Sequence, residues 1–203
     1  MQNYSVFLVT DFEATCDHPT QCDPMEIIEF PVLLVNGETF QVEKMFHSYV
    51  KPDVHPILSP FCTQLTGIVQ ETIDNADSFS NVLIKFNDWI YNDAKLICPK
   101  TQQTLRPFTF ATCGNWDFQM MLYDQCARQK LKIPPYMRSW INVKKSFVGS
   151  VGKWPKSLND MVTSLKMTPV GRQHSGVDDC HNLVQIMKAL ADQGCVFKNT
   201  NQI

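Results

Sequence analysis

Residues Ser5 to Thr15 read S-V-F-L-V-T-D-F-E-A-T, and this stretch decides the fold. The run from Val6 to Thr10 is apolar or β-branched without a polar break, which predicts a strand buried on both faces of a sheet. Because strand side chains alternate, Asp11 and Glu13 are expected on one side with Phe12 facing the other way. Carboxylates this close repel each other unless a cation lies between them, and a hard divalent metal is the simplest candidate. For D-x-E alone, the alternative is the polar end of a strand.

The composition is that of a globular protein of ordinary size. The 203 residues suit one domain with a sizeable core, and 44% are hydrophobic and 19% charged. No apolar run reaches the length of a membrane span, and the N-terminus lacks a secretory signal pattern. The eight cysteines include no C-x-x-C pair, which favours reduced thiols. We therefore expect a single intracellular domain over residues 1–203, cytoplasmic or nuclear, with no membrane partner.

Basic residues are concentrated in one part of a chain whose formal net charge is −2. The window from Gln125 to Asn159 has no acidic residue and contains eight basic ones: Arg128, Lys130, Lys132, Arg138, Lys144, Lys145, Lys153 and Lys156. A basic segment beside an acidic metal pocket suits a polyanionic substrate. The basic residues would bind its backbone while the metal site acts on one phosphate. The alternative is a solvated lysine-rich face.

The rest of the chain alternates strand and helix patterns, which predicts an α/β protein. Met25 to Val35 predicts a second strand, Asn36-Gly37 a two-residue hairpin turn, and Thr39 to Val50 the returning strand. Another buried strand is expected over Phe108 to Thr112. Helices are expected from Phe61 to Gly67, over 78–91, from Asp117, over Trp140 to Phe147, from Ser157, and from Val177 to Gly194. Asn92 to Arg106 is polar and predicts a surface excursion.

Acidic residues stand where the first strand ends, where the 108–112 strand is followed by a helix, and where the final helix begins: Asp11, Glu13, Asp117, Asp178 and Asp179. Carboxylates converging from these places would build a two-metal site, with ions roughly 3.5 to 4 Å apart, for in-line displacement at phosphorus. His174, on the preceding loop, would deprotonate the attacking water. Taken singly, Asp117 and Asp178 are also N-terminal helix residues favoured by the helix dipole, and His174 is an exposed loop histidine.

Five motifs in this order resemble the DEDDh (DnaQ-like) 3′-to-5′ exonucleases: D-F-E-A-T-C, E-I-I-E-F-P, L-T-G-I, G-N-W-D and H-S-G-V-D-D. More narrowly, they resemble the enhanced-RNAi or three-prime histone-mRNA exonuclease group. The stretches F-C-T-Q-L-T-G-I and H-S-G-V-D-D-C-H-N resemble its third paralogous branch. The resemblance spans about Tyr4 to Phe197. It implies an RNase H-like fold, with a five-stranded mixed sheet flanked by helices, and action on RNA 3′ ends, with single-stranded DNA as a second substrate.

The resemblance also implies roles for individual residues. Two Mg²⁺ or Mn²⁺ ions are held by Asp11, Glu13, Asp117 and Asp179, and Asp178 is a neighbour, not a ligand. His174 serves as the general base, and a nucleoside 5′-monophosphate is released.

A nucleotide pocket beside these acids is expected to include Phe12, Ala14, Met25, Leu65, Trp116 and His174. Trp116 would stack on the terminal base, because stacking is tolerant of base identity. Phe12 with Met25 or Leu65 would form a wall, and the backbone amides of residues 12–14 would contact the terminal ribose. For Phe12 and Leu65, core packing is the alternative.

Two features depart from the family pattern. The polar stretch from Asn92 to Arg106 is longer than a tight connection needs and would affect substrate access. No SAP-type nucleic-acid-binding extension precedes the motifs, so stem-loop specificity is not expected.

Other classes of function remain to be compared with this one. A binding module for nucleic-acid 3′ ends that acts through partners is the main alternative, although a pure binder gains nothing from like charges that need metals. P-loop hydrolysis is disfavoured, because G-S-V-G-K from Gly149 lacks the early glycine and is followed by Trp154 where Ser or Thr is needed.

Overall fold

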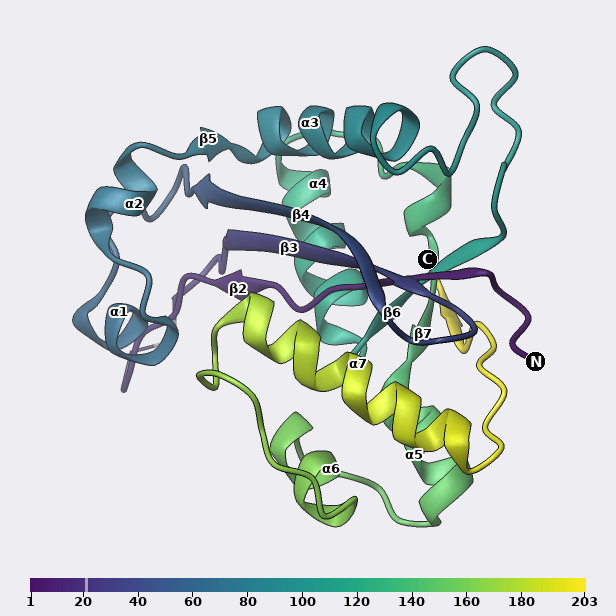
Figure 1. Ribbon diagram of the computed structural model, residues 1–203. Coiled ribbons are helices and arrows are strands. Elements are labelled where there is room, and N and C mark those ends of the chain that lie inside the picture. The colour runs from purple at the N-terminus through teal and green to yellow at the C-terminus, as the bar shows by residue number, and fades with distance from the viewer. Residues whose placement is uncertain (21) are drawn as a thin grey trace.

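A computed structural model describes residues 1–20 and 22–203 and has the expected α/β architecture (Figure 1). The strands form one mixed sheet in the order β5-β4-β3-β1-β6-β7-β8, with β2 paired to β3. The long strands are β1 (Val6–Val9), β3 (Ile27–Asn36), β4 (Val42–Lys51), β6 (Phe108–Thr112) and β7 (Ser139–Asn142). Two-residue strands, absent from the prediction, complete the described sheet of eight: β2 (Glu13–Ala14), β5 (Asp77–Ser78) and β8 (Asn201–Gln202). Four of the five long strands were predicted from the sequence, and β7 was not.

Strand β1 is the centre of the sheet, as its sequence predicts. It pairs antiparallel with β3 and parallel with β6, so that Val9 lies between Leu33 and Ala111. All four of its side chains are fully buried, because both faces of the sheet are covered. Val6 and Leu8 pack into the core on one face, and Phe7 and Val9 into the core on the other.

Helices cover the sheet in two layers, and Figure 1 shows α3 and α7 on opposite sides of it. One layer contains α3 (Phe79–Asn92), the π-helix η1 (Trp116–Leu122) and α4 (Tyr123–Arg128). The other contains α5 (Val143–Val151), α6 (Leu158–Ser164) and α7 (Gly176–Asp192). A smaller cluster at the end of the sheet includes residues of α1 (Pro60–Thr66) and α2 (Gln70–Asp74), and η2 (Pro135–Met137) is a short 3₁₀ turn.

The connection after β3 is longer than the predicted two-residue hairpin. The Asn36 side chain accepts hydrogen bonds from the N–H groups of Glu38 and Thr39, which turns the chain away before β4 begins at Val42. Phe40 then adopts a left-handed backbone conformation (φ 58°) and stacks on Phe7, with a centroid distance of 5.7 Å. Burial of Phe40 thus favours a five-residue connection over the tight turn.

The predicted helix from Trp140 to Phe147 is wrong in its first half. Residues through Asn142 belong to β7, and the Asn142 side chain then caps α5 by accepting the N–H of Lys145 at 3.2 Å. A short apolar run such as W-I-N-V is ambiguous between strand and helix, and pairing with β6 decides it here.

The 92–106 segment loops away from α3 as expected, and it is also anchored. Leu96 and Ile97 are buried, and Ile97 forms an isolated antiparallel bridge with Thr104. Among the described residues, no helix is both long and apolar enough to cross a membrane.

Candidate active site

The first acidic pair lies where β1 gives way to β2. The Thr10 hydroxyl donates to the backbone oxygen of Pro31 at 2.7 Å, which fixes the chain as it leaves β1. Asp11 follows in the irregular connection, and Glu13 resumes pairing with β3 opposite Glu29. Both carboxylates line the same cavity.

Asp117 is on the π-helix η1, which follows β6, the parallel neighbour of β1. Its side chain is only 2% exposed, and its Oδ1 accepts the Phe12 N–H at 2.9 Å. Sequence periodicity predicted a helix here but not its π-type hydrogen bonding, which recurs at functional sites. The Asp117 carboxyl group is close enough to Asp11 to raise the pKa of that residue.

The third element of the site is the N-terminus of α7 and the loop before it. The His174 N–H donates to Asp179 Oδ2 at 2.9 Å, which ties the loop to the first turn of the helix. His174 adopts a left-handed conformation (φ 61°), an uncommon state that concentrates at functional sites. Asp178 instead accepts the N–H of Arg172 at 2.9 Å, which holds its carboxylate toward the preceding loop.

These elements meet at a cavity of about 320 Å³. Asp11, Glu13, His174 and Asp179 line it, and the buried Asp117 is a neighbour of Asp11. Ligand atoms of Glu13, His174 and Asp179 lie within 4.8 Å of one another, close enough for one cation to touch all three. The structure thus brings together five residues from three segments that are far apart in sequence.

The carboxyl groups strongly perturb one another. Burial and then the charge of Asp179 raise the pKa of Glu13 to about 9, and burial raises that of Asp117 to about 6. Burial, followed by the charges of Asp117, Asp179 and Glu13, raises the pKa of Asp11 well above its ordinary value. Burial also raises the pKa of Asp179. Such a cluster binds protons when no cation compensates it, and oxygen ligands of this kind suit a hard divalent metal.

All six residues expected for the nucleotide pocket line the same cavity: Phe12, Ala14, Met25, Leu65, Trp116 and His174. Phe12 also belongs to the core, where its ring centroid lies 4.7 Å from that of Phe30, so this residue both packs in the core and lines the cavity. The Phe12 N–H is already donated to Asp117 and is not available to a ribose. Leu65 is partly exposed at the cavity wall. Sequence reasoning missed six further lining residues: Thr15, Cys16, Cys113, Ser157, Leu158 and Gln173.

Glu29 is a supporting residue that the sequence analysis did not single out. Its buried carboxylate accepts the Gly176 N–H at 3.0 Å and contacts His47 Nε2 at 2.7 Å. A carboxylate at a helix N-terminus is electrostatically favourable. Glu29 therefore fixes the start of α7, which carries Asp179, against β3.

Gly176 allows α7 to begin in contact with the β1–β2 connection. A Cβ atom there would lie 2.7 Å from the backbone oxygen of Asp11 and 3.0 Å from Glu29 Oε2. We expect Gly176→Ala to lower the free energy of unfolding by about 1 to 3 kcal/mol through overpacking. Urea unfolding would measure the loss.

Gly149→Ala is the matched control, because a Cβ on this residue of α5 meets nothing within 4 Å. Helix propensity predicts a gain of about 0.5 to 1 kcal/mol there. Equal stability changes at the two glycines would contradict the close approach described for Gly176.

Comparison with known proteins places this geometry in a family. Residues 8–187 match the exonuclease (RNase_T) family. The human protein "ERI1 exoribonuclease 3" is 46% identical over 202 residues, which cover 99% of this chain and 58% of the relative. The chain thus spans somewhat more than half the length of that relative.

Two solved structures share the fold over nearly the whole chain. The nuclease domain of 3′hExo, described as a DEDDh family member bound to rAMP, has a TM-score of 0.90 and 35% identity and covers 99% of this chain and 98% of its own. A 3′-exonuclease described in the 3′-end-specific recognition of histone mRNA stem-loop has a TM-score of 0.88 and 36% identity and covers 100% and 68%. These matches confirm the RNase H-like fold expected from the motifs. The chain belongs to the exonuclease family, in the group of DEDDh-type ERI1 and 3′hExo proteins.

Proposed function

We propose that this chain is a metal-dependent 3′-to-5′ exoribonuclease domain spanning residues 1–203. The observation that carries the proposal is the meeting of three carboxylates and one imidazole at a single cavity, with the buried Asp117 carboxyl group next to Asp11. Core clusters on both faces of one sheet support a single domain. RNA is the proposed substrate, and single-stranded DNA is a second one. The eight free thiols favour a reducing compartment, cytoplasmic or nuclear.

Asp11, Glu13, Asp117 and Asp179 are the proposed ligands of two Mg²⁺ or Mn²⁺ ions. Their hard oxygen donors and raised pKa values fit divalent cations. When bound, such ions polarise a phosphodiester and make a nearby water more acidic. Asp178 is not proposed as a ligand, because its carboxylate accepts the N–H of Arg172.

His174 is the proposed general base. Its ring lies close to the Glu13 and Asp179 oxygens, and its backbone is held by Asp179, so the imidazole faces the acidic cluster. In that position it takes a proton from the water that attacks the terminal phosphorus. As the water oxygen bonds to phosphorus, the bond from phosphorus to the 3′ oxygen of the preceding nucleotide breaks. That oxygen takes up a proton and becomes the new 3′-hydroxyl end, and a nucleoside 5′-monophosphate is released.

The cavity walls are proposed to hold the terminal nucleotide. Trp116 offers a face for base stacking, and Phe12, Ala14, Met25 and Leu65 form the remaining wall. A structure of the related nuclease domain is described as bound to rAMP, which supports a mononucleotide site here.

A panel of labelled substrates tests this function. Single-stranded and duplex RNA and DNA, each with a 3′-hydroxyl or a 3′-phosphate, are incubated with Mg²⁺ or with EDTA. We expect stepwise release of nucleoside 5′-monophosphates from RNA 3′-hydroxyl ends, stalling at 3′-phosphates, and no release in EDTA. Tight binding of RNA ends without any release in Mg²⁺ or Mn²⁺ would instead favour the binding-module alternative.

The stabilisation of the folded protein by bound Mg²⁺ should increase with pH. The raised pKa values of Glu13 and Asp117 mean that the folded metal-free protein binds more protons than the unfolded chain, so its stability falls as pH rises toward 9. Cations replace those protons more easily at high pH. We expect the rise in Tm caused by saturating Mg²⁺ to be larger near about pH 9 than near about pH 6. Differential scanning fluorimetry with Mg²⁺ or EDTA measures it, and a pH-independent rise would argue against the acidic cluster as the binding site.

A further inference from the structure

An exposed tryptophan lies in the loop that leads into the cavity. Residues Lys153 to Lys156 read K-W-P-K and connect α5 to α6. Trp154 is 57% exposed, whereas Pro155 beside it is buried. The exposed part of this aromatic ring is open to contact by a ligand.

Both ends of this loop are fixed. Gly152 ends α5 in a left-handed conformation (φ 78°), with its N–H donated to the Val148 oxygen at 2.8 Å. At the other end, Lys144 Nζ donates to the Lys156 oxygen at 2.9 Å, and the Lys156 N–H donates to Asp160 Oδ2 at 2.8 Å. The indole is therefore presented from an anchored turn and not from a free end.

The loop is continuous with the candidate active site. Ser157 and Leu158 line the cavity, and Ser157 is three residues beyond Trp154. Three extended residues span at most about 11 Å, so the backbone of Trp154 lies within that distance of the cavity-lining Ser157. This distance equals about three nucleotides stacked at about 3.4 Å each.

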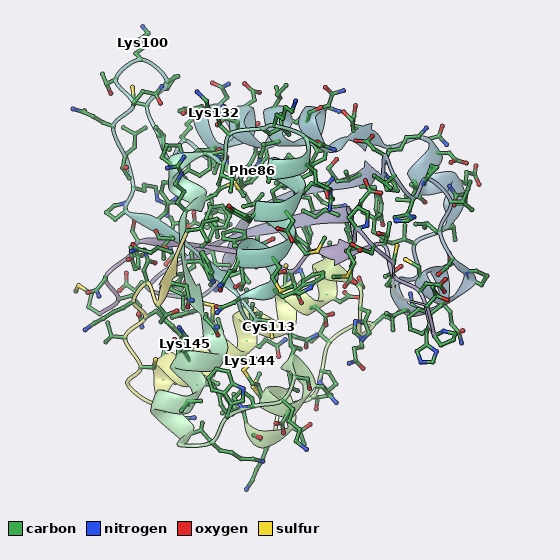
Figure 2. The ribbon with its side chains drawn as sticks, turned by 180° about the vertical axis from the view of Figure 1, so that it is seen from behind. Phe86, Lys100, Cys113, Lys132, Lys144 and Lys145 are labelled. Carbon is green, nitrogen blue, oxygen red and sulfur yellow. The ribbon has the colours of Figure 1, made fainter. Side chains whose placement is uncertain are left out.

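The surroundings carry positive charge. Lys153 and Lys156 flank Trp154 in the sequence and are exposed, and the nearest acidic residue along the chain, Asp160, already accepts the Lys156 N–H. Lys144 and Lys145 lie on α5 in Figure 2, and the Lys144 N–H donates at 3.2 Å to the backbone oxygen of Cys113, a residue that lines the cavity. Charge of this sign complements a phosphate backbone entering the site.

We propose that Trp154 is a stacking platform for a nucleobase upstream of the terminal nucleotide, with Lys153 and Lys156 contacting the phosphates beside it. An exposed aromatic ring between cations is the arrangement by which proteins bind single strands without reading sequence. This inference rests on the proposed exonuclease function and adds a second contact to the substrate strand. Substrates that extend beyond the cavity gain from it, and a dinucleotide does not.

Steady-state kinetics of Trp154→Ala test the platform on two substrates, a single-stranded RNA of about 12 nucleotides and a dinucleotide. Loss of one stacked base should raise KM for the longer RNA by about 5- to 100-fold, because stacking contributes that much to affinity. The dinucleotide kinetics should equal those of the wild type, which also verifies that the variant is folded and active. Trp154→Phe should restore most of the affinity for the longer RNA, because a phenyl ring still stacks.

Charge and surface controls complete the test. Lys156→Gln should reduce the slope of log KM against log salt by about 0.7 for the longer RNA, as expected for one lost phosphate contact on a single strand. Ile84→Ala, at an apolar side chain that is 66% exposed on α3 on the opposite face, should change nothing. Unchanged kinetics of Trp154→Ala on the longer RNA, with an active wild type, overturn the platform alone. A wild type that releases no nucleotides from either substrate overturns the proposed function instead.

Discussion

Asp11→Asn is expected to reduce nucleotide release by at least about 10³-fold, equivalent to about 4 kcal/mol of activation free energy. Asp11 lies among the charges of Asp117, Asp179 and Glu13, all of which raise its pKa after the effect of burial. A neutral amide removes one anionic ligand and also this repulsion. The metal-free variant should therefore unfold at the same temperature as the wild type or higher, while the Tm rise caused by Mg²⁺ shrinks.

Asp178→Asn is the matched control for this substitution. Asp178 is the neighbour of Asp179, but its carboxylate accepts the N–H of Arg172, which an amide oxygen also does. We expect its activity to stay close to that of the wild type. Full activity of Asp11→Asn, measured as 5′-monophosphate release with Mg²⁺, would contradict the proposed two-metal mechanism.

Loss of the His174 imidazole is expected to lower kcat by about 10² to 10⁴, the usual range for a general base. Because His174 has a left-handed backbone (φ 61°), His174→Asn is the better variant, and His174→Ala its comparison. Asn tolerates that conformation and cannot act as a base near neutral pH. Single-turnover rates on RNA measure the effect directly.

His181→Ala on α7 serves as the control, since this histidine does not line the cavity. Its rate should match that of the wild type. Near-normal turnover in both His174 variants at neutral pH would assign proton removal to another group.

Much of the fold was predictable because the burial of β1 is visible in its sequence as an uninterrupted apolar run. Its uninterrupted apolar residues are fully buried in the structure, and Phe7 and Leu8 point into separate cores as alternation requires. Pairing with distant strands was harder to foresee. Residues Ser139–Asn142 form a strand because they pair in parallel with β6, and the local sequence pattern does not indicate this pairing.

The acidic residues were identifiable because each stands where a strand ends or a helix begins. Their supporting contacts were not, because those contacts join segments far apart in the sequence. The bond from Phe12 to Asp117 spans 105 residues, and the bond from Gly176 to Glu29 spans 147. For the same reason the sequence did not show that Ser157 and Leu158 line the cavity, or that the K-W-P-K loop ends there.

Anomalous diffraction from crystals soaked in Mn²⁺ tests the central claim most directly. The account predicts two Mn²⁺ peaks roughly 3.5 to 4 Å apart, in contact with the carboxylates of Asp11, Glu13, Asp117 and Asp179. The same soak of Asp11→Asn crystals should show at least one peak weakened or lost. Fully occupied Mn²⁺ sites elsewhere, with none at these four carboxylates, would contradict the account.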